Sequence, residues 1–325
     1  MRKRKIGYRI AFVMLGLCLI ALTFLMFVLP AAKAGKAPEL TVRSTPELIQ
    51  RGKYLANHVA ICMDCHSSRD WSRYSGPPIA GTFGAGGEVF NRDMGFPGVF
   101  YSKNITPAHL RDWSDGDILH AFTAGVNKQG KALFPIMPYL YYNKMDPEDA
   151  YAIIAYLRTL NPIDKTVPDR VVDFPMDLII NTIPLKTDLR PKPPKSDIIA
   201  YGGYLTMVAG CAECHTREKN GQIVQSLRFG GGRAFKMPDG ILYSANITPD
   251  PVNGIGKWTA SDFVKKFKFY ADMAALGKLK PGDKNTVMPW SMYSGMDTTD
   301  LQAIYAYLHS IKPIRLSNSA EVAGL

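Results

Sequence analysis

The chain has 325 residues, of which 46% are hydrophobic and 21% charged, a composition typical of a globular protein rather than a disordered one. Its length allows two domains of ordinary size. The formal net charge of +11 is concentrated at the N-terminus: residues 2–9 hold five Lys or Arg and no acid, whereas residues 47–165 hold 12 charges of each sign. This distribution gives no support to nucleic-acid binding, and we expect no nucleic-acid partner.

An uncharged run of 20 residues, 10–29, follows the basic segment. As a helix it would rise about 30 Å, enough to cross the hydrocarbon core of a lipid bilayer. We therefore expect a single-pass anchor in the cytoplasmic (inner) membrane, with the remainder on the periplasmic side because basic flanks stay cytoplasmic. The expected segments are a cytoplasmic basic tail (1–9), a transmembrane anchor (10–30) and a linker (31–46). A cleaved signal peptide, with Ala32-Lys33-Ala34 as the cleavage site, is the alternative, although its apolar region normally has about 7–15 residues.

Two short strings share the pattern Cys-x-x-Cys-His. They consist of Cys62, Cys65 and His66, and of Cys211, Cys214 and His215. The pattern is the attachment signal for c-type haem, since two thiols reach the two vinyl groups of one porphyrin and the histidine supplies the proximal iron ligand. We therefore expect two covalently bound haem c groups. The alternatives are a thioredoxin-like redox pair, which lacks a βαβ pattern here, and half of a zinc site, which usually needs both pairs in one module.

Each string lies in one copy of an internal repeat. A Tyr-Leu pair, a glycine-rich loop, a Tyr-Ser-x-Asn-Ile-Thr-Pro segment, a Met-Pro pair and an Ala-Tyr-Leu block occur in the same order in both copies. The last block predicts a helix, because Asp146 and Asp297 are good N-caps and apolar residues follow at helical spacing. We expect an all-α fold with two tandem haem domains (47–165 and 198–315), a proline-rich linker (166–197) and a tail (316–325). The apolar middle of the linker, 178–183, is expected to pack within the chain.

Each haem iron needs a second axial ligand or an open site, and this choice separates an electron carrier from a catalyst. Two methionines of each copy are matched by the repeat. Met137 and Met288 lie in Met-Pro loops before the last helix, which could reach over a haem face. Met145 and Met296 directly precede the N-caps, where packing as a hydrophobic staple explains them. We therefore predict Met137 and Met288 as the second iron ligands.

Supporting roles are less specific. The proximal histidine should donate its other ring N–H to a backbone carbonyl, and Pro78 is the candidate partner of His66. Leu227 has the same spacing in the second copy, so the partner of His215 stays open. Candidates for holding haem propionates, with turn and core structure as the alternative, are Tyr101, Asn104, Trp113, Tyr243, Asn246 and Trp258. Histidines without a counterpart in the other copy, expected in loops or on the surface, are His58, His109, His120 and His309.

Together these segments resemble the membrane-bound cytochrome c subunits of bacterial periplasmic dehydrogenases for alcohols, gluconate, fructose and aldehydes. The resemblance rests on the two haem strings, the Tyr-Ser-x-Asn-Ile-Thr-Pro segments, the run 254–258 (Gly-Ile-Gly-Lys-Trp) and the Met-Pro loops. It implies small α-helical cytochrome c-type domains, with electrons passing from a catalytic subunit through successive haems to quinone or an oxidase. Members often carry three haem strings, whereas this chain has two and an N-terminal anchor, which leaves donor and acceptor open.

We therefore expect a membrane-anchored dihaem c-type cytochrome that catalyses no substrate chemistry by itself. It would transfer single electrons between a membrane dehydrogenase or quinol-oxidising complex and a respiratory acceptor, such as another cytochrome or a terminal oxidase. One alternative is a wiring or structural subunit of a respiratory supercomplex or oxidase. A less supported one is a dihaem peroxidase-type enzyme, which needs an open or histidine-switched haem.

Overall fold

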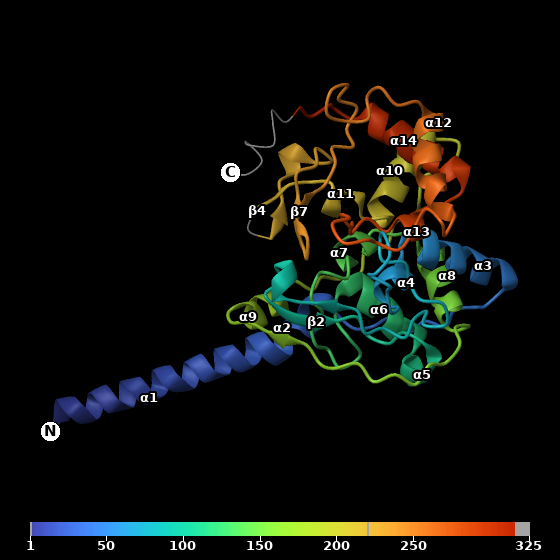
Figure 1. Cartoon of the computed structure of the whole chain (residues 1–325). Coiled ribbons are helices and arrows are strands. Elements are labelled where there is room, and N and C mark those ends of the chain that lie inside the picture. The colour runs from blue at the N-terminus through green and yellow to red at the C-terminus, as the bar shows by residue number, and fades with distance from the viewer. Residues whose placement is uncertain (1, 220, 316–325) are drawn as a thin grey trace. The chain divides into compact units, whose positions relative to one another are not determined.

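The computed structural model describes residues 2–219 and 221–315, so the expected tail, 316–325, lies outside the described residues. Most of the described secondary structure is helical (Figure 1). The α-helices are α1 (Arg2–Thr23), α2 (Leu29–Ala34), α3 (Pro46–Tyr54), α4 (Cys62–Cys65), α5 (Pro107–Leu110), α6 (Asp115–Ala124), α7 (Tyr139–Tyr142), α8 (Pro147–Leu157), α9 (Met176–Ile179), α10 (Ile198–Val208), α11 (Cys211–Cys214), α12 (Ala260–Lys268), α13 (Trp290–Tyr293) and α14 (Thr298–Ser310). Short π or 3-10 segments are η1 (Phe24–Val28), η2 (Leu55–Val59), η3 (Arg92–Met94), η4 (Ile180–Thr182), η5 (Gln225–Leu227) and η6 (Phe269–Ala271).

The prediction of an all-α fold holds only in part, because the structure also contains short strands. They are β1 (Val89–Phe90), β2 (Gly98–Tyr101), β3 (Val171–Val172), β4 (Glu218–Lys219), β5 (Gln222–Ile223), β6 (Ala234–Met237) and β7 (Gly240–Tyr243). β1 pairs with β2, β4 with β5 and β6 with β7, all antiparallel. Most of them lie in the long loops after the Cys-x-x-Cys-His strings, where backbone groups without a helix need other hydrogen-bond partners. The fold is therefore mainly helical, with small hairpins in the loops.

The chain packs into two compact units that do not follow the two repeats. One comprises the residues up to Thr41 together with Trp113–Lys144 and Val172–Leu189. The other comprises Val42–Asp112, Met145–Val171 and the residues from Arg190 onward. The second unit contains both Cys-x-x-Cys-His strings and the first and last helices of both repeats. The domain boundaries expected from the repeat therefore remain a prediction, because packing divides the chain differently.

In each repeat the first and last helices cross closely at a glycine. A Cβ built on Gly52 of α3 would lie 1.8 Å from the carbonyl oxygen of Ala152 in α8. A Cβ on Gly202 of α10 would lie 1.8 Å from that of Ala303 in α14. Real atoms cannot approach so closely, so only glycine permits either crossing. The two crossings are repeat-equivalent and place the Cys-x-x-Cys-His string just after each first helix.

The two repeats bind each other through reciprocal tyrosine–aspartate contacts within the second unit. Tyr54 of the first repeat donates to Asp300 of the second (2.8 Å), and Tyr204 of the second donates to Asp149 of the first (2.7 Å). Both carboxylates are buried. Each tyrosine hydroxyl also accepts the N-cap backbone N–H of the same last helix: Asp297 to Tyr54 at 3.1 Å and Asp146 to Tyr204 at 3.3 Å. A tyrosine from one repeat thus bridges the N-cap and third residue of the other's last helix, a contact that a capping box makes directly.

The first unit begins with α1, the long dark blue helix of Figure 1, which continues through η1 into α2. Residues Lys5–Ala34 form the one helix in the described part of the chain that is long and apolar enough to cross a membrane, and none of its most apolar stretch is buried. Elsewhere in this unit, the Asn143 amide donates to the carbonyls of Thr123 (2.9 Å) and Lys186 (2.7 Å). These bonds tie the linker to α6 and α7.

Two candidate haem-binding sites

Both Cys-x-x-Cys-His strings form one helical turn that begins after a left-handed residue. Ile61 (φ 47°) precedes α4, and Gly210 (φ 64°) precedes α11. Glycine adopts this backbone freely, whereas for a β-branched isoleucine it is an outlier held by its surroundings. The turn that follows places two cysteines three residues apart on one helix face. His66 and His215 are the C-cap residues of these turns, so the imidazole emerges where the helix ends.

Each proximal histidine is held by a backbone carbonyl of the Tyr-Ser-x-Asn-Ile-Thr-Pro segment. The Nδ1 atom of His66 lies 2.7 Å from the Lys103 carbonyl oxygen, and that of His215 lies 2.7 Å from the Ala245 carbonyl oxygen. Because a carbonyl can only accept, Nδ1 carries the proton and donates it. The Nε2 lone pair of each ring is then available to a metal, as a haem iron requires.

The prediction of Pro78 as the partner of His66 is wrong. The segment after His66 folds back on itself. Arg69 and Pro78 form an isolated antiparallel β-bridge, and the Ile79 backbone N–H donates to the Ser68 carbonyl at 2.8 Å. Pro78 is therefore committed to that turn. The true partner, Lys103, has Ala245 at the matching repeat position, which also answers the question left open for His215.

A glycine packs against the carbonyl group that holds each histidine ring, Gly86 against that of Lys103 and Gly231 against that of Ala245. Gly86 (φ 68°) and Gly231 (φ 73°) donate their backbone N–H to the carbonyls of His66 (2.9 Å) and His215 (2.8 Å). A Cβ on Gly86 would lie 2.5 Å from the carbonyl carbon of Lys103, and one on Gly231 would lie 2.6 Å from that of Ala245. The glycine-rich loop is thus needed for the histidine to be held at both its backbone and its ring.

Burial sets the protonation of these groups. It lowers the pKa of His66 and of His215, an effect that the hydrogen bond to the carbonyl opposes only in part. Both imidazoles are therefore neutral near pH 7. Burial also raises the pKa of the Cys62 and Cys65 thiols to about 12, so both remain protonated at that pH. A neutral imidazole with a free Nε2, and two thiols in the S–H form that adds across a vinyl group, fit a covalently attached haem.

A zinc site is not favoured by the arrangement of ligands. Among the described residues, no group of three or more His, Cys, Asp or Glu side chains gathers in a way that could hold a metal ion. The two cysteine pairs therefore do not combine into one four-ligand site of the structural zinc type.

The propionate candidates divide by side chain. Asn104 donates to the carbonyls of Ile163 (2.8 Å) and Lys165 (3.2 Å), and the equivalent Asn246 donates to that of Ile314 (2.6 Å). The amide of Asn104 thus uses both its hydrogens to tie its segment to the chain after the last helix, so the turn-and-core alternative describes this pair. Tyr243 is exposed and Tyr101 half-buried, and neither hydroxyl has a hydrogen-bond partner among the described residues. Trp113 belongs to the first unit and Trp258 to the second.

The two methionine pairs differ in burial. Met145 and Met296 are fully buried, which agrees with a packing role before the N-caps. Met137 and Met288 are half-buried, each just before a one-turn helix, α7 or α13. Met137 belongs to the first unit and Met288 to the second. The burial pattern leaves Met137 and Met288 as the candidates for iron ligands.

The Met288 loop is braced by a loop of the first repeat, a contact that no sequence pattern indicated. The Ser75 hydroxyl donates to the Met288 carbonyl (2.6 Å) and accepts the Trp290 backbone N–H (3.0 Å). The Asn285 side chain accepts the Ser75 backbone N–H (2.9 Å) and donates to the Trp71 and Arg73 carbonyls (both 3.3 Å). Ser75 is buried and has a left-handed backbone. The loop that would carry the second haem's ligand is therefore positioned by residues beside the first string.

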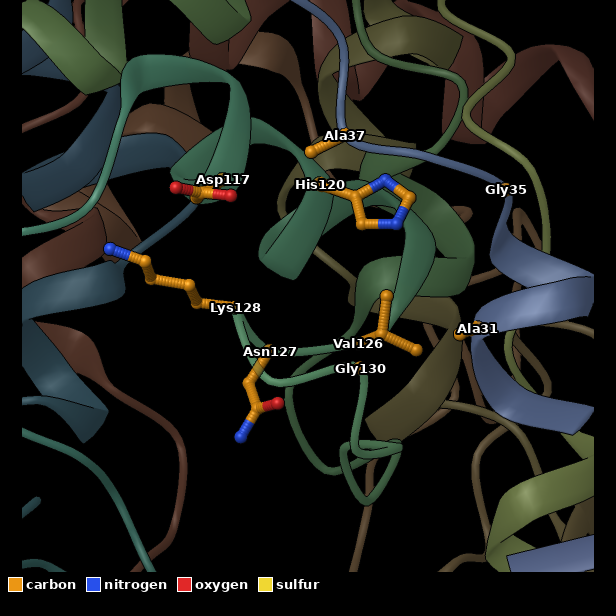
Figure 2. Close-up of a pocket in the computed structure, with 9 residues that line it drawn as sticks. All are labelled: Ala31, Gly35, Ala37, Asp117, His120, Val126, Asn127, Lys128 and Gly130. Atoms are coloured by element: carbon orange, nitrogen blue, oxygen red, sulfur yellow. The ribbon is translucent and has the colours of Figure 1, made fainter. Parts of the chain in front are cut away.

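The unmatched histidines have local roles. The His58 ring contacts the Met292 carbonyl (2.8 Å), the His309 ring contacts that of Ile255 (3.1 Å), and His109 is exposed. His120 lines a pocket of about 110 Å³ in the first unit, beside Gly35 and Val126 (Figure 2). Burial lowers the pKa of His120, so its ring is neutral. None of these four residues has a counterpart in the other repeat.

Residues 199–312 match the cytochrome c family, which agrees with the covalent haem chemistry of the second site. The second repeat is therefore a cytochrome c domain. Over 301 residues the chain is 29% identical to the cytochrome c subunit of the quinone alcohol dehydrogenase of Gluconacetobacter polyoxogenes, covering 86% of this chain and 59% of that one. It is 28% identical over 284 residues to the gluconate 2-dehydrogenase cytochrome c subunit of Pantoea cypripedii, covering 81% and 59%.

A third relative, a dihaem c-type cytochrome of Cereibacter sphaeroides, is 28% identical over 315 residues, covering 89% of this chain and 97% of the relative. The chain thus spans 59% of the dehydrogenase subunits and nearly the whole of the dihaem protein. The expected resemblance is confirmed: the chain is related to the cytochrome c subunits of dehydrogenases.

Proposed function

We propose that the chain is a membrane-anchored dihaem c-type cytochrome that passes single electrons from a membrane dehydrogenase or quinol-oxidising complex to a respiratory acceptor. The observation that carries this proposal is the pair of repeat-equivalent sites, each with two thiols, a neutral imidazole and a carbonyl that fixes its tautomer. When bound, haem iron supplies reversible one-electron chemistry. The dihaem relative supports the number of two.

The chain's own residues would supply both protein ligands of each haem iron. The carbonyls of Lys103 and Ala245 would orient the His66 and His215 rings, and such hydrogen bonds raise the basicity of the ligating nitrogen. Met137 and Met288 would supply the other protein ligand of each iron, which would leave no site open to a substrate. The contacts between the repeats in the second unit support an electron relay in which the two haem sites stay at a fixed distance and orientation.

Support for the anchor comes from the length and apolarity of Lys5–Ala34, with basic residues before it. On this reading the haem domains lie on the periplasmic side of the inner membrane. The names of the related subunits support a dehydrogenase as the electron donor, and another cytochrome or a terminal oxidase would accept the electrons.

Haem content tests this function directly. The full chain, produced with a c-type haem maturation system, should gain the mass of two haems and show two low-spin spectra. The double substitution Cys211→Ala/Cys214→Ala should remove one haem, whereas Cys18→Ala, in the apolar run, should remove none. A haem count of one in the unsubstituted chain, or a high-spin haem with peroxidase activity, would contradict the proposal.

A further inference from the structure

The linker between the repeats packs on the outer end of the N-terminal helix. η4 (Ile180–Thr182) contacts both η1 (Phe24–Val28) and α2, and Ile180 is buried there. The Lys33 ammonium of α2 donates to the Thr182 carbonyl. Figure 1 shows α9 beside α2, where the long helix ends. All of these residues belong to the first unit.

This packing fixes the depth of the linker if the helix spans a membrane, and the inference therefore rests on the proposed anchor. η1 lies inside the uncharged run 10–29, in its last third. That run is about as long as the hydrocarbon core is thick, so its last turns lie near the boundary between acyl chains and headgroups. A segment that touches η1 must lie at about the same depth.

The surface chemistry of this segment suits that boundary. Phe174 is 80% exposed and Ile179 44% exposed, just before and at the end of α9. Asp177, the one charged residue of 174–183, is half-buried, and its backbone carbonyl accepts the Asn181 amide. Large aromatic and aliphatic side chains on one face, with basic residues beside them, are typical of elements that lie in a membrane interface.

Cations surround the same end of the helix. Lys33, Lys36 and Lys186 are exposed, and the Lys186 side chain lies near Gly35. At the level of the headgroups such ammonium groups can contact lipid phosphates, while the apolar side chains enter the acyl boundary. We propose that α9 and η4 form a second membrane contact, in which Phe174 and Ile179 insert into the lipid interface beside the anchor.

Spin-label accessibility tests this contact in the full, haem-loaded chain reconstituted in phosphatidylcholine–phosphatidylglycerol vesicles. Cys18 is the one cysteine outside the haem strings and lies in the apolar run, so a nitroxide there reports on the anchor itself. In a Cys18→Ser background, Phe174→Cys and Ile179→Cys report on the linker. Phe269→Cys is the matched control, because Phe269 is also exposed but belongs to the second unit. Relaxation by oxygen, which concentrates in lipid, is compared with relaxation by a nickel chelate that stays in water.

The labels at 174 and 179 should give an oxygen-to-nickel ratio severalfold above that at 269, approaching the ratio at Cys18. If Cys18 favours oxygen while 174 and 179 match 269, the anchor stands and the second contact is refuted. Protection of 174 and 179 from both reagents would mean that protein covers them, a second copy or a partner subunit, and would also refute a lipid contact. Loss of Cys18 from the mature chain, or a water-like ratio there, overturns the anchor and this inference together.

Discussion

At each Cys-x-x-Cys-His string, the imidazole is held at its ring by a carbonyl and at its backbone by a glycine amide. The two sets of contacts repeat almost without change: Lys103 and Ala245 supply carbonyls at 2.7 Å, and Gly86 and Gly231 supply the amides. A backbone carbonyl has no side-chain signature, which is why spacing pointed to Pro78 instead. The repeat alignment did contain the signal, because Lys103 and Ala245 occupy matching positions beside matched glycines.

Gly231→Ala should therefore perturb the second haem alone. The added Cβ would meet the Ala245 carbonyl carbon at 2.6 Å and push that carbonyl away from His215. A weaker hydrogen bond lowers the basicity of the imidazole, so the reduction potential of this haem should rise, as measured by spectroelectrochemistry. Gly221→Ala is the control, since Gly221 has a similar φ of 75° but open space around it. Both should lose about 1 kcal/mol of stability to backbone strain; equal potentials in both variants would argue against the carbonyl's role.

Ser75→Ala should loosen the Met288 loop. The substitution removes two hydrogen bonds at a buried position, at a cost of about 1–3 kcal/mol. If Met288 is the ligand, the charge-transfer band of methionine-ligated ferric haem should weaken for one haem and persist for the other. Ser310→Ala removes an exposed hydrogen bond of the last helix and should leave both bands unchanged. An undiminished band in Ser75→Ala would show that the brace does not hold the ligand.

At the scale of elements, the last helices α8 and α14 are each completed by a tyrosine from the other repeat. The surroundings of the two acceptors differ. Asp149 also binds Arg51 through two bonds, at 3.0 and 2.9 Å, and Lys192 at 3.1 Å. Asp300 has two more distant partners, the Lys195 ammonium at 3.7 Å and the Tyr201 hydroxyl at 3.5 Å, and its Oδ1 is buried without a hydrogen bond. The symmetric contact is therefore electrostatically unequal.

Tyr54→Phe should accordingly destabilise the protein more than Tyr204→Phe. Loss of a hydrogen bond to a charged group costs about 1.5–3 kcal/mol. The partners that remain to Asp300 after this loss are weaker than those that remain to Asp149. Chemical denaturation of the haem-loaded protein would measure both, with Tyr151→Phe as the control because the hydroxyl of this half-buried residue of α8 has no hydrogen-bond partner among the described residues. A greater loss in Tyr204→Phe would contradict this ranking.

The Asp149 cluster also predicts an acid-sensitive contact. Burial alone would raise the pKa of Asp149, but Arg51, Tyr204 and Lys192 outweigh it and hold the pKa below its ordinary value. A depressed carboxyl pKa stabilises the fold above the unfolded value, about 3.9, and this contribution disappears as the pH falls through the folded value. Asp149→Asn should lose about 3 kcal/mol at pH 7 by leaving Arg51 unpaired. Its unfolding free energy should also depend less on pH below about 4 than that of the unsubstituted chain; parallel pH profiles would refute this.

At the scale of the whole molecule, local patterns were predictable and contacts between distant segments were not. The N-cap at Asp146 and the burial of Met145 and Met296 followed from the capping pattern, and the long N-terminal helix followed from the uncharged run 10–29. The β6–β7 hairpin was missed although the run Pro238-Asp239-Gly240, whose first two residues form the loop, is a turn signal. The Ser75 brace and the tyrosine bridges could not be foreseen, because they depend on how two helical repeats meet in space.

The tyrosine bridges also determine the order in which the two repeats can complete their contacts during synthesis. A chain that leaves its site of synthesis from the N-terminus forms the first repeat while residue 204 is still to come. Until then the Asp146 N–H and the Asp149 carboxylate lack the Tyr204 hydroxyl, and afterwards Tyr54 reaches forward to complete α14. The last helix of each repeat thus obtains its full set of hydrogen bonds only when the other repeat is present, so a cut between the repeats would remove a bridging tyrosine from both halves.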